Sequence, residues 1–285
     1  MDVSNLAGAK VLVTGAASGI GKESALAFAR RGADLVICDR DADGLAVSEK
    51  LIRSLGHDVL SEVVDVSSAE EMGAFAERVH ANFEAVDILM NNAGVALGAG
   101  FLDTSLEDWE WILSINLMGV IHGCHYFVPR MVQRGRGGHV VNVSSAAGFF
   151  ASQALSAYAT SKFGVLGLSE ALRDELAPHG IGVTAICPGI IDTPITSTTR
   201  LRGVADSEEA RRYLVEAYRR RNYSPARVAR NVLKAVQRNR MVAPISPEAW
   251  ALYYVKRLFP SLAYWLTRRL SESQRRRFES LRTGD

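Results

Sequence analysis

The stretch KVLVTGAASGIG, residues 10–21, decides the fold of this chain. Its first five residues are a short, valine-rich apolar run of the kind that forms a buried strand. The remaining residues form a glycine-rich loop that leads into a helical pattern. Gly15 allows a tight turn, and Gly19 and Gly21 let the backbone and the start of the helix approach a pyrophosphate. The free N–H groups of a helix N-terminus attract such an anion, so the stretch predicts a strand, a phosphate-binding loop and a helix.

Six more short apolar runs, most of them rich in β-branched residues, follow this strand. They are DLVIC, VLSEVV, VDILMN, HVVNVS, GVTAIC and MVAPI, and helix-length segments separate them. Among these segments, residues 105–134 and 156–177 carry helical patterns. Strands that alternate with helices indicate βαβ units. We therefore predict an α/β fold, a Rossmann-type doubly wound parallel sheet of about seven strands.

Neither a repeat nor a linker interrupts the chain before about residue 245. We therefore predict one Rossmann-type domain over residues 1–245. Residues 194–225 break the alternation of strands and helices before the last strand, and we expect them to form a helical lid over the substrate. Residues 246–285 are basic and aromatic, and we expect them to form a C-terminal helical extension.

The composition is that of an ordinary globular protein: 285 residues, 48% hydrophobic and 22% charged, with a formal net charge of +2. The nearly balanced charge gives no indication of a nucleic-acid partner. The cysteines Cys38, Cys124 and Cys187 each lie in an apolar run, which indicates buried thiols in a reducing compartment. The chain shows no metal-ligand spacing, no signal-peptide pattern and no run approaching 18 apolar residues. We expect a cytoplasmic protein without a metal.

Asp39 ends the second apolar strand, 18 residues after Gly21. At about this distance an acidic residue meets the adenosine ribose in dinucleotide sites. Its carboxylate would accept hydrogen bonds from the ribose hydroxyls and repel a 2′-phosphate, which favours NAD over NADP. Arg40 leaves NADP open, because its guanidinium could reach a 2′-phosphate. Alternatively, Arg40 is solvated or paired with Asp41 or Asp43.

YATSK, residues 158–162, places a phenol and an ammonium one helical turn apart. Side chains at i and i+4 share a helix face, so Lys162 lies beside Tyr158 if the stretch is helical. A nearby cation lowers the pKa of a tyrosine from about 10 towards working pH, which would make Tyr158 a general acid/base. Alternatively, Tyr158 is a half-buried packing residue and Lys162 is a solvated surface charge.

Taken in order, these motifs and several others resemble the classical short-chain dehydrogenase/reductase (SDR) family over about residues 7–245. The residues that match the family's motifs are Thr14, Gly15, Gly19, Gly21, Asp65, Val66, Asn91, Asn92, Ala93, Gly94, Asn116, Ser145, Tyr158, Lys162, Pro188, Gly189 and Thr193. The resemblance implies NAD, or NADP, as the cofactor. The cofactor contacts that it implies are Gly15, Ser18, Gly19, Ile20, Gly21, Asp39, Arg40, Asp65, Val66, Asn92, Ala93, Gly94, Tyr158, Lys162, Pro188, Gly189, Ile191 and Thr193.

The resemblance also implies a catalytic set of Asn116, Ser145, Tyr158 and Lys162. Tyr158 would pass a proton to or from the substrate oxygen, and Ser145, thirteen residues upstream, would hydrogen-bond the same oxygen. Lys162 would hold the nicotinamide ribose, and Asn116 would order a water that links Lys162 to solvent. Ser144 is equally near the strand end, and the family's spacing to the tyrosine selects Ser145.

The residues around the expected carbonyl position are apolar, and no cation there awaits a carboxylate or phosphate. They are Leu97, Phe101, Ala146, Ala147, Phe149, Phe150, Ala154, Leu155, Ile190, Ile191 and Ile195. We therefore predict an oxidoreductase that interconverts an apolar secondary alcohol and a ketone. Two alternatives stay open: an NADPH-preferring ketone reductase with the same residues, and a non-catalytic dinucleotide-binding regulator. The usual mark of such a regulator is loss of the tyrosine or the lysine, and both are present.

Within the family, the chain is most similar to members with a basic C-terminal extension. These are hydroxysteroid-type and retinol-type dehydrogenases and the reductase-like module fused to some epoxide-hydrolase-type proteins. Residues 105–131 and 156–177 carry more apolar surface than one sheet face should cover, and related enzymes pair through these helices. We therefore expect a homodimer or a homotetramer.

The extension mixes aromatic and basic side chains between residues 250 and 277, on short helical pieces broken at Pro260. The pattern suits a segment on an anionic membrane, with apolar side chains in the interface and cations at the headgroups. In the alternative, the aromatic residues pack over the substrate pocket or a neighbouring subunit, and the arginines are solvated. The residues concerned are Trp250, Tyr253, Tyr254, Lys256, Arg257, Leu258, Phe259, Trp265, Leu266, Arg268, Arg269, Leu270, Arg275, Arg276 and Arg277.

Overall fold

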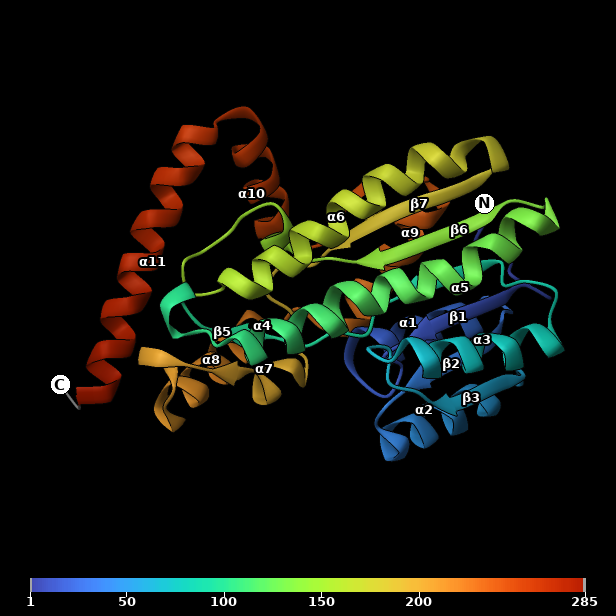
Figure 1. Cartoon of the computed structure of the whole chain (residues 1–285), viewed down its shortest axis with the longest axis horizontal. Helices are drawn as coiled ribbons and strands as arrows, with labels where there is room; N and C mark the ends of the chain where they lie inside the picture. The colour runs from blue at the N-terminus through green and yellow to red at the C-terminus, as the bar shows by residue number, and fades with distance from the viewer. Residues whose placement is uncertain (1, 284–285) are drawn as a thin grey trace.

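The computed structural model describes residues 2–283. A parallel sheet with the strand order β3-β2-β1-β4-β6-β7-β9 forms its centre (Figure 1). The strands are β1 (Lys10–Thr14), β2 (Asp34–Asp39), β3 (Val59–Val63), β4 (Ile88–Asn91), β6 (Gly138–Val143), β7 (Ile181–Cys187) and β9 (Val242–Pro244). Every neighbouring pair is parallel. These strands coincide with the seven apolar runs, so the predicted doubly wound sheet is confirmed.

The order of the strands reverses between β1 and β4. From β1 the sheet continues to β2 and β3 on one side, and from β4 it continues to β6, β7 and β9 on the other. The loops that leave the carboxyl ends of β1 and β4 therefore diverge and open a crevice. In open α/β sheets this switch point is where ligands bind.

Helices cover both faces of the sheet, because successive strand residues point to opposite sides. Val11 of β1 packs in a first core and the next residue, Leu12, in a second. The first core is covered by α1 (Gly19–Ala29), α2 (Ala42–Ser54) and α9 (Pro225–Gln237), and the second by α3 (Ala69–Asn82), α5 (Gly119–Arg134) and α6 (Ser156–Leu176). Short turns are η1 (Phe101–Asp103), η3 (Ala146–Gly148) and η4 (Ala177–His179).

The helix α4 (Leu106–Leu113) continues into α5 through the π-helical turn η2 (Ser114–Met118). Within residues 2–283, this rod, Leu106–Arg134, is the one helix long and apolar enough to cross a membrane by length and composition. That finding qualifies the expectation that no segment resembles a span. Half of the apolar window is buried inside the protein, and Phe127 lies in the second core. The rod is therefore a core helix of this fold.

The predicted lid contains more than helices. Between β7 and α9 the chain forms α7 (Ile195–Thr198), β8 (Arg200–Leu201), η5 (Gly203–Ala205) and α8 (Glu208–Arg221). The strand β8 pairs in parallel with β5 (Leu97–Gly98). The sequence does not predict this small sheet, because two residues show no period.

Asp108 of α4 fastens the lid to the rod. Its carboxylate is buried and pairs with the guanidinium groups of Arg200 at 3.3 Å and Arg202 at 2.8 Å. The guanidinium of Arg200 also lies over Trp111, 3.6 Å from the ring centre. These contacts join segments that are more than ninety residues apart in the sequence.

The C-terminal extension forms two helices, α10 (Pro247–Leu258) and α11 (Pro260–Thr283), which break at Pro260 as predicted. Tyr253 of α10 packs edge-on against Phe149, with ring centres 5.4 Å apart. The helix α11 runs past α8 and η5 (Figure 1), and the hydroxyl oxygens of Ser152 and Ser271 lie 3.1 Å apart. One face of the extension therefore packs on the lid and on the loop after β6. The predicted domain boundary at residue 245 stays a prediction.

Asp108→Asn should loosen the attachment of the lid. The substitution removes the negative charge that compensates two arginines, and we expect the free energy of unfolding to fall by about 1.5–3 kcal/mol, the range for a hydrogen bond to a charged group. Urea unfolding measures this loss. Glu110→Gln, on the exposed side of the same helix, is the matched control and should change stability by no more than about 0.5 kcal/mol. Equal stability of the two variants would contradict the assignment.

Candidate active site

Thr14 ties the glycine-rich loop to the loop after β4. Its hydroxyl oxygen accepts hydrogen bonds from the main-chain nitrogens of Asn92 at 3.0 Å and Ala93 at 3.1 Å. In return, the side-chain nitrogen of Asn92 donates to the carbonyl oxygens of Thr14 at 2.9 Å and Gly15 at 3.1 Å. The predicted cofactor residues Asn92 and Ala93 therefore lie at the switch point, beside the glycine-rich loop.

The glycines of this loop are required for steric reasons. Gly15 and Gly19 have φ angles of +68° and +54°, in the left-handed region that L side chains disfavour. A Cβ atom on Gly21 would overlap the carbonyl oxygen of Gly15. The loop therefore turns tightly and packs directly against the start of α1.

The N-terminus of α1 keeps its N–H groups available for an anion. Its N-cap residue, Ser18, is exposed and makes no capping hydrogen bond with its side chain, and the first turn holds no acidic residue. The next residue, Ile20, packs against the first core. By contrast, Asp41 caps α2 and Ser68 caps α3, and both helices carry acids in the first turn. The positive end of α1 therefore fits the pyrophosphate of a dinucleotide.

The carboxylate of Asp39 lies against the glycine-rich loop. It accepts hydrogen bonds from the main-chain nitrogens of Ala17 at 2.9 Å and Asp41 at 3.0 Å, and it is partly exposed. Arg40 is exposed and makes no ion pair with any residue between 2 and 283 for which side chains are described. The alternative in which Arg40 pairs with Asp41 or Asp43 is therefore wrong, and the guanidinium is free to move.

Asp65 and Val66 follow β3 at the rim of the same crevice. The main-chain nitrogen of Val64 donates to the carbonyl oxygen of Asp39, so the ends of β2 and β3 lie side by side. Asp65 accepts hydrogen bonds from the main-chain nitrogen and the hydroxyl of Ser67, at 2.9 Å and 2.7 Å. Val66 is buried. This position, next to Asp39, suits the predicted contact with adenine.

Asn116 holds the loop after β4 from the opposite side. Its side-chain oxygen accepts from the nitrogen of Val95 at 2.8 Å, and its side-chain nitrogen donates to the Val95 carbonyl at 2.9 Å and to the hydroxyl of Ser161 at 3.1 Å. These bonds accompany the π-helical turn, a distortion common at functional sites. Both hydrogens of the amide are used within the protein, so the predicted water would need another atom of Asn116.

Gly94 leaves open the space between Asn116 and Lys162. A Cβ atom there would lie 3.1 Å from the side-chain oxygen of Asn116 and 3.4 Å from Nζ of Lys162. The loop can therefore accept a ligand group where any other residue would place its side chain. Together with the free start of α1, this cradle fits the predicted dinucleotide.

Lys162 is buried, with 4% of its surface exposed, and its Nζ donates to the carbonyl oxygen of Val143 at 3.1 Å. Nζ lies 5.9 Å from the centre of the Tyr158 ring. Burial lowers the pKa of Lys162 from 10.5 to about 8, because removal from water disfavours the charged ammonium. The alternative of a solvated surface charge is therefore wrong.

Tyr158 retains its proton at neutral pH. Burial raises the pKa of Tyr158 from 10 to about 12, and a hydrogen bond with Ser145 acts in the opposite direction. The expectation that Lys162 lowers the pKa of this tyrosine is therefore wrong for the protein on its own. Loss of water around the phenolate is the largest cause, and Lys162, whose Nζ lies 5.9 Å from the ring centre, is not among the groups that shift this pKa.

The two serines after β6 point in different directions. Ser145 faces Tyr158, and its hydroxyl oxygen also accepts from the main-chain nitrogen of Ala147 at 3.1 Å. Ser144 is buried and donates to the main-chain carbonyl of Lys162 at 2.8 Å. Ser145 is therefore the serine that can meet a substrate beside Tyr158, whereas Ser144 fixes the helix that carries Lys162.

The loop after β7 closes the crevice near the glycine-rich loop. A Cβ atom on Gly19 would lie 3.5 Å from the side chain of Thr193, and the carbonyl oxygen of Pro188 accepts from the nitrogen of Ala146 at 2.8 Å. A Cβ atom on Gly189 would overlap the hydroxyl of Ser246, at the start of α10. Ile191 is buried in the first core. Its side chain therefore anchors the loop, and a cofactor contact would have to involve its main chain.

Tyr218, on the lid helix α8, is a residue near the site that the sequence does not predict. Burial raises the pKa of its phenol, and Tyr218 in turn contributes to raising the pKa of Tyr158. The helix α8 therefore brings the phenol of Tyr218 near that of Tyr158. The tyrosine lies within the amphipathic segment YLVEAYRR, but the sequence cannot show that this segment folds back over residue 158.

The predicted apolar lining is only partly correct. Four of its members are packed in the cores, because their side chains join neighbouring elements: Leu97, Ala147, Phe149 and Ile191. Phe101 is 69% exposed and packs on Trp109, with ring centres 6.2 Å apart. Fewer apolar side chains than predicted are therefore free to contact a substrate.

Comparison with known proteins agrees with this geometry. The chain matches the family model described as short chain dehydrogenase over residues 9–202. It is 45% identical over 254 residues to the "Probable oxidoreductase EphD" of Mycobacterium tuberculosis, covering 88% of this chain and 43% of that protein. It thus spans less than half the length of this relative. SadH of the same species, also named as an oxidoreductase, is 35% identical over 263 residues, covering 91% of this chain and 94% of that protein.

A solved structure shares the whole architecture. The short chain dehydrogenase/reductase from Burkholderia phymatum in complex with NAD superimposes with a TM-score of 0.82 and 30% identity, over 92% of this chain and 96% of that one. The chain belongs to the short-chain dehydrogenase family of oxidoreductases.

Lys162→Met tests the burial of the ammonium. The folded protein releases this proton near pH 8 and the unfolded chain near 10.5, so the unfolded chain binds more protons between these values and the free energy of unfolding rises with pH there. We expect urea titrations between pH 7.5 and 9.5 to show the free energy of unfolding of the unaltered protein rising by about 2 kcal/mol relative to that of Lys162→Met, which lacks the titrating ammonium.

The control for this experiment is Lys50→Met, because Lys50 is exposed on α2. That variant should keep the full rise. Tyr158 and the buried thiols Cys38, Cys124 and Cys187, whose pKa values burial raises, lower the stability as the unfolded chain ionises, but all three proteins contain them, so their effect largely cancels in the comparison. An equal rise in the Lys162→Met and Lys50→Met proteins would show that Lys162 does not cause it.

Proposed function

We propose that this protein is an NAD(P)-dependent oxidoreductase that interconverts an apolar secondary alcohol and a ketone, with Tyr158 as the general acid/base. The observation that carries the proposal is the meeting of Ser145, Tyr158 and Lys162 beside the Gly94 cradle. A non-catalytic regulator would have no need for a buried lysine next to a half-buried tyrosine. Family membership supports the same reaction class.

Tyr158 and Ser145 would both act on the substrate oxygen, which is a carbonyl or a hydroxyl oxygen depending on the direction of the reaction. When bound, the nicotinamide supplies or accepts the hydride. Tyr158 is protonated at neutral pH, which suits a proton donor for carbonyl reduction. Oxidation of an alcohol requires the tyrosinate, and a positive charge brought close to the phenol would lower its pKa. Ser145 donates a hydrogen bond to the same oxygen and stabilises the charge that develops on it.

Lys162 and Asn116 would position these groups. Lys162, with a pKa of about 8, carries its charge for most of the time at neutral pH, and its ammonium is available for a ribose hydroxyl at the Gly94 cradle. Asn116 keeps the cradle in place through its two hydrogen bonds to Val95. A proton relay through a water on Asn116 stays part of the proposal.

We propose NAD as the preferred dinucleotide. The carboxylate of Asp39, held beside the glycine-rich loop, would bind ribose hydroxyls and repel a 2′-phosphate. The complex of the Burkholderia phymatum protein with NAD supports this choice. A second candidate, an NADPH-preferring ketone reductase, is favoured by the exposed guanidinium of Arg40.

The substrate that fits this site is apolar, with one further polar atom. Tyr218 makes no hydrogen bond within the described part of the chain, and its phenol is near enough to Tyr158 to raise the pKa of that residue. Its hydroxyl could bind a second oxygen on the substrate. The remaining side chains predicted around the carbonyl are apolar, which suits an aromatic, terpenoid, steroid-like or lipid-derived alcohol.

We also propose that the protein is a homodimer or a homotetramer. Met118 of the rod and Phe163 of α6 are each 40% exposed, on the two helices that are expected to pair. A two-fold contact through them would cover both side chains.

Tyr158→Phe should lower kcat/KM by at least about 10²-fold to 10⁴-fold, because the variant keeps the ring and loses only the transferable proton. Turnover is followed at the absorbance band of the reduced nicotinamide, with a panel of apolar ketones and alcohols. The affinity for the dinucleotide, measured by fluorescence titration, should stay within about threefold, since the phenol oxygen is a minor part of that site.

Tyr126→Phe is the matched control, because Tyr126 lies on α5 beside α3, far from the catalytic set. It should leave turnover unchanged. Near-normal activity of Tyr158→Phe would refute the role assigned to Tyr158. Absence of turnover in the unaltered protein with every substrate, combined with tight dinucleotide binding, would favour the regulator instead.

A further inference from the structure

The turn between α10 and α11 exposes several large apolar side chains. Every residue from Lys256 to Leu262 is exposed. We call this segment, with the adjoining Tyr264 and Trp265, the hairpin tip. Its large apolar side chains are exposed by 46% to 71%: Leu258, Phe259, Leu262, Tyr264 and Trp265. Contiguous exposed apolar residues of this size mark contact sites.

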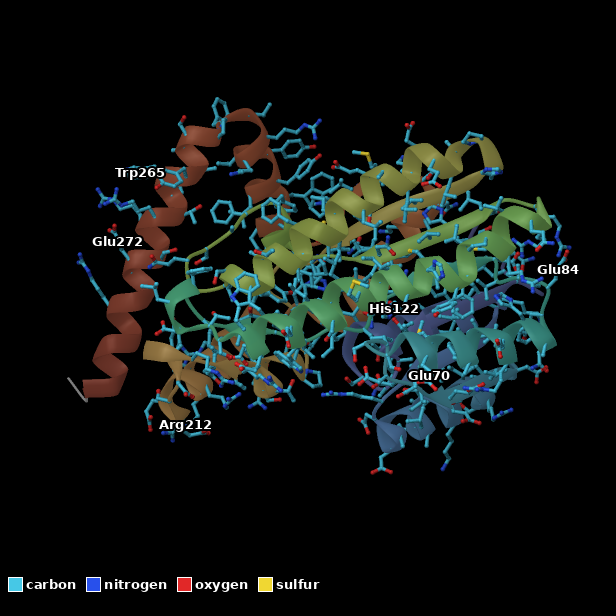
Figure 2. The ribbon with its side chains drawn as sticks, in the orientation of Figure 1. Glu70, Glu84, His122, Arg212, Trp265 and Glu272 are labelled. Atoms are coloured by element: carbon cyan, nitrogen blue, oxygen red, sulfur yellow. The ribbon has the colours of Figure 1, made fainter. Side chains whose placement is uncertain are left out.

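The hairpin is firmly attached to the protein by its other face. Ala249 and Ala263 are buried, Tyr253 packs against Phe149, and Ser271 meets Ser152. The exposure of the tip is therefore a property of a packed element. Figure 2 shows Trp265 and Glu272 along α11, with Trp265 towards α10 and farther than Glu272 from Arg212 of the lid.

The charge around the tip has one sign. Residues 249–271 contain four basic residues and no acidic one. Lys256 and Arg269 make no ion pair with a described residue, and Arg257 donates to the hydroxyl of Tyr253 at 3.0 Å. Arg269 also lies over the ring of Trp265, at 5.2 Å from its centre. Only Arg268 has a carboxylate partner, Glu272 at 3.0 Å.

We propose that the hairpin tip docks on an anionic lipid surface. Exposed leucine and phenylalanine at a helix break can enter the interface, while tyrosine and tryptophan lie at headgroup level and the four cations meet anionic headgroups. A second copy of the chain is a poor occupant. A two-fold contact of the tip with itself would place cations against cations.

The position of the tip suits delivery of an apolar substrate. The helix α11 leads from the tip along the lid elements η5 and α8, and α8 carries Tyr218. A docked tip would therefore hold the lid within the length of α11 of a surface in which apolar alcohols and ketones dissolve. Only this consequence rests on the proposed function, because docking can be measured without any substrate.

Sedimentation with vesicles tests the proposal on the full chain. Truncation is unsuitable, because it would remove Tyr253 from Phe149, so point variants of exposed residues are used. The apolar variant is Leu258→Ser with Phe259→Ser, and the charge variant is Lys256→Gln with Arg269→Gln. Val47→Ser is the matched control, because Val47 is 54% exposed on α2. Vesicles contain phosphatidylcholine, with or without phosphatidylserine.

We expect the unaltered chain and Val47→Ser to pellet with the anionic vesicles, and less so at high salt, which screens the attraction. The charge variant should bind about fivefold more weakly for each cation removed, and the apolar variant at least about tenfold more weakly. Failure of the unaltered chain to pellet with anionic vesicles would overturn the proposal. Equal pelleting of both tip variants and Val47→Ser would do so as well.

Light scattering tests whether a second copy of the chain, and not a lipid surface, covers the hairpin tip. We expect both tip variants to keep the mass of the unaltered protein, because lipid docking does not involve a second copy. A smaller mass for the apolar variant, without vesicle binding by the unaltered chain, would assign the tip to a subunit contact and contradict the lipid proposal.

The side chains of Leu270, Arg275 and Arg277, which the sequence pattern also includes, lie outside the described residues.

Discussion

Hydrogen bonds hold the loop after β4 from two sides, and the arrangement of the site depends on these bonds. Thr14 and Asn92 bind each other's main chain on one side, and Asn116 clamps Val95 on the other. The first contact fixes the loop to the glycine-rich turn, and the second fixes it to the rod and to α6 through Ser161. The dinucleotide cradle and the catalytic helix therefore keep one geometry.

The second constraint is the removal of water from the Lys162 ammonium and the Tyr158 phenol. It follows from the first, because the same contacts hold their helix in place. A helix held this closely against the sheet keeps water from Lys162 and Tyr158, so one group binds its proton less tightly and the other more tightly than in water. The pair is thus poised to respond to a ligand that brings charge or removes water. A surface pair with the same spacing would lack this sensitivity, because solvent would screen it.

Much of this could be predicted from the sequence, because local spacing encodes it. The strand β1, the glycine-rich loop and the Tyr158–Lys162 turn are contiguous motifs whose geometry follows from strand and helix periods. The contacts between Asp108 and its two arginines, the β5–β8 pair and the position of Tyr218 join distant segments, and no period shows them. The pKa of Tyr158 could not be predicted either, because it depends on burial, which only the packed structure defines.

The most direct test of the proposed reaction is transfer of a labelled hydride. The protein is incubated with apolar ketones and with reduced NAD or NADP that carries deuterium at the reactive carbon. The masses of the alcohols formed are then determined by mass spectrometry. We predict that the product gains one deuterium, on the carbon that bears the new hydroxyl, and that reduced NAD is the better donor. Tight binding of the dinucleotide without deuterium in any product would contradict the proposed function.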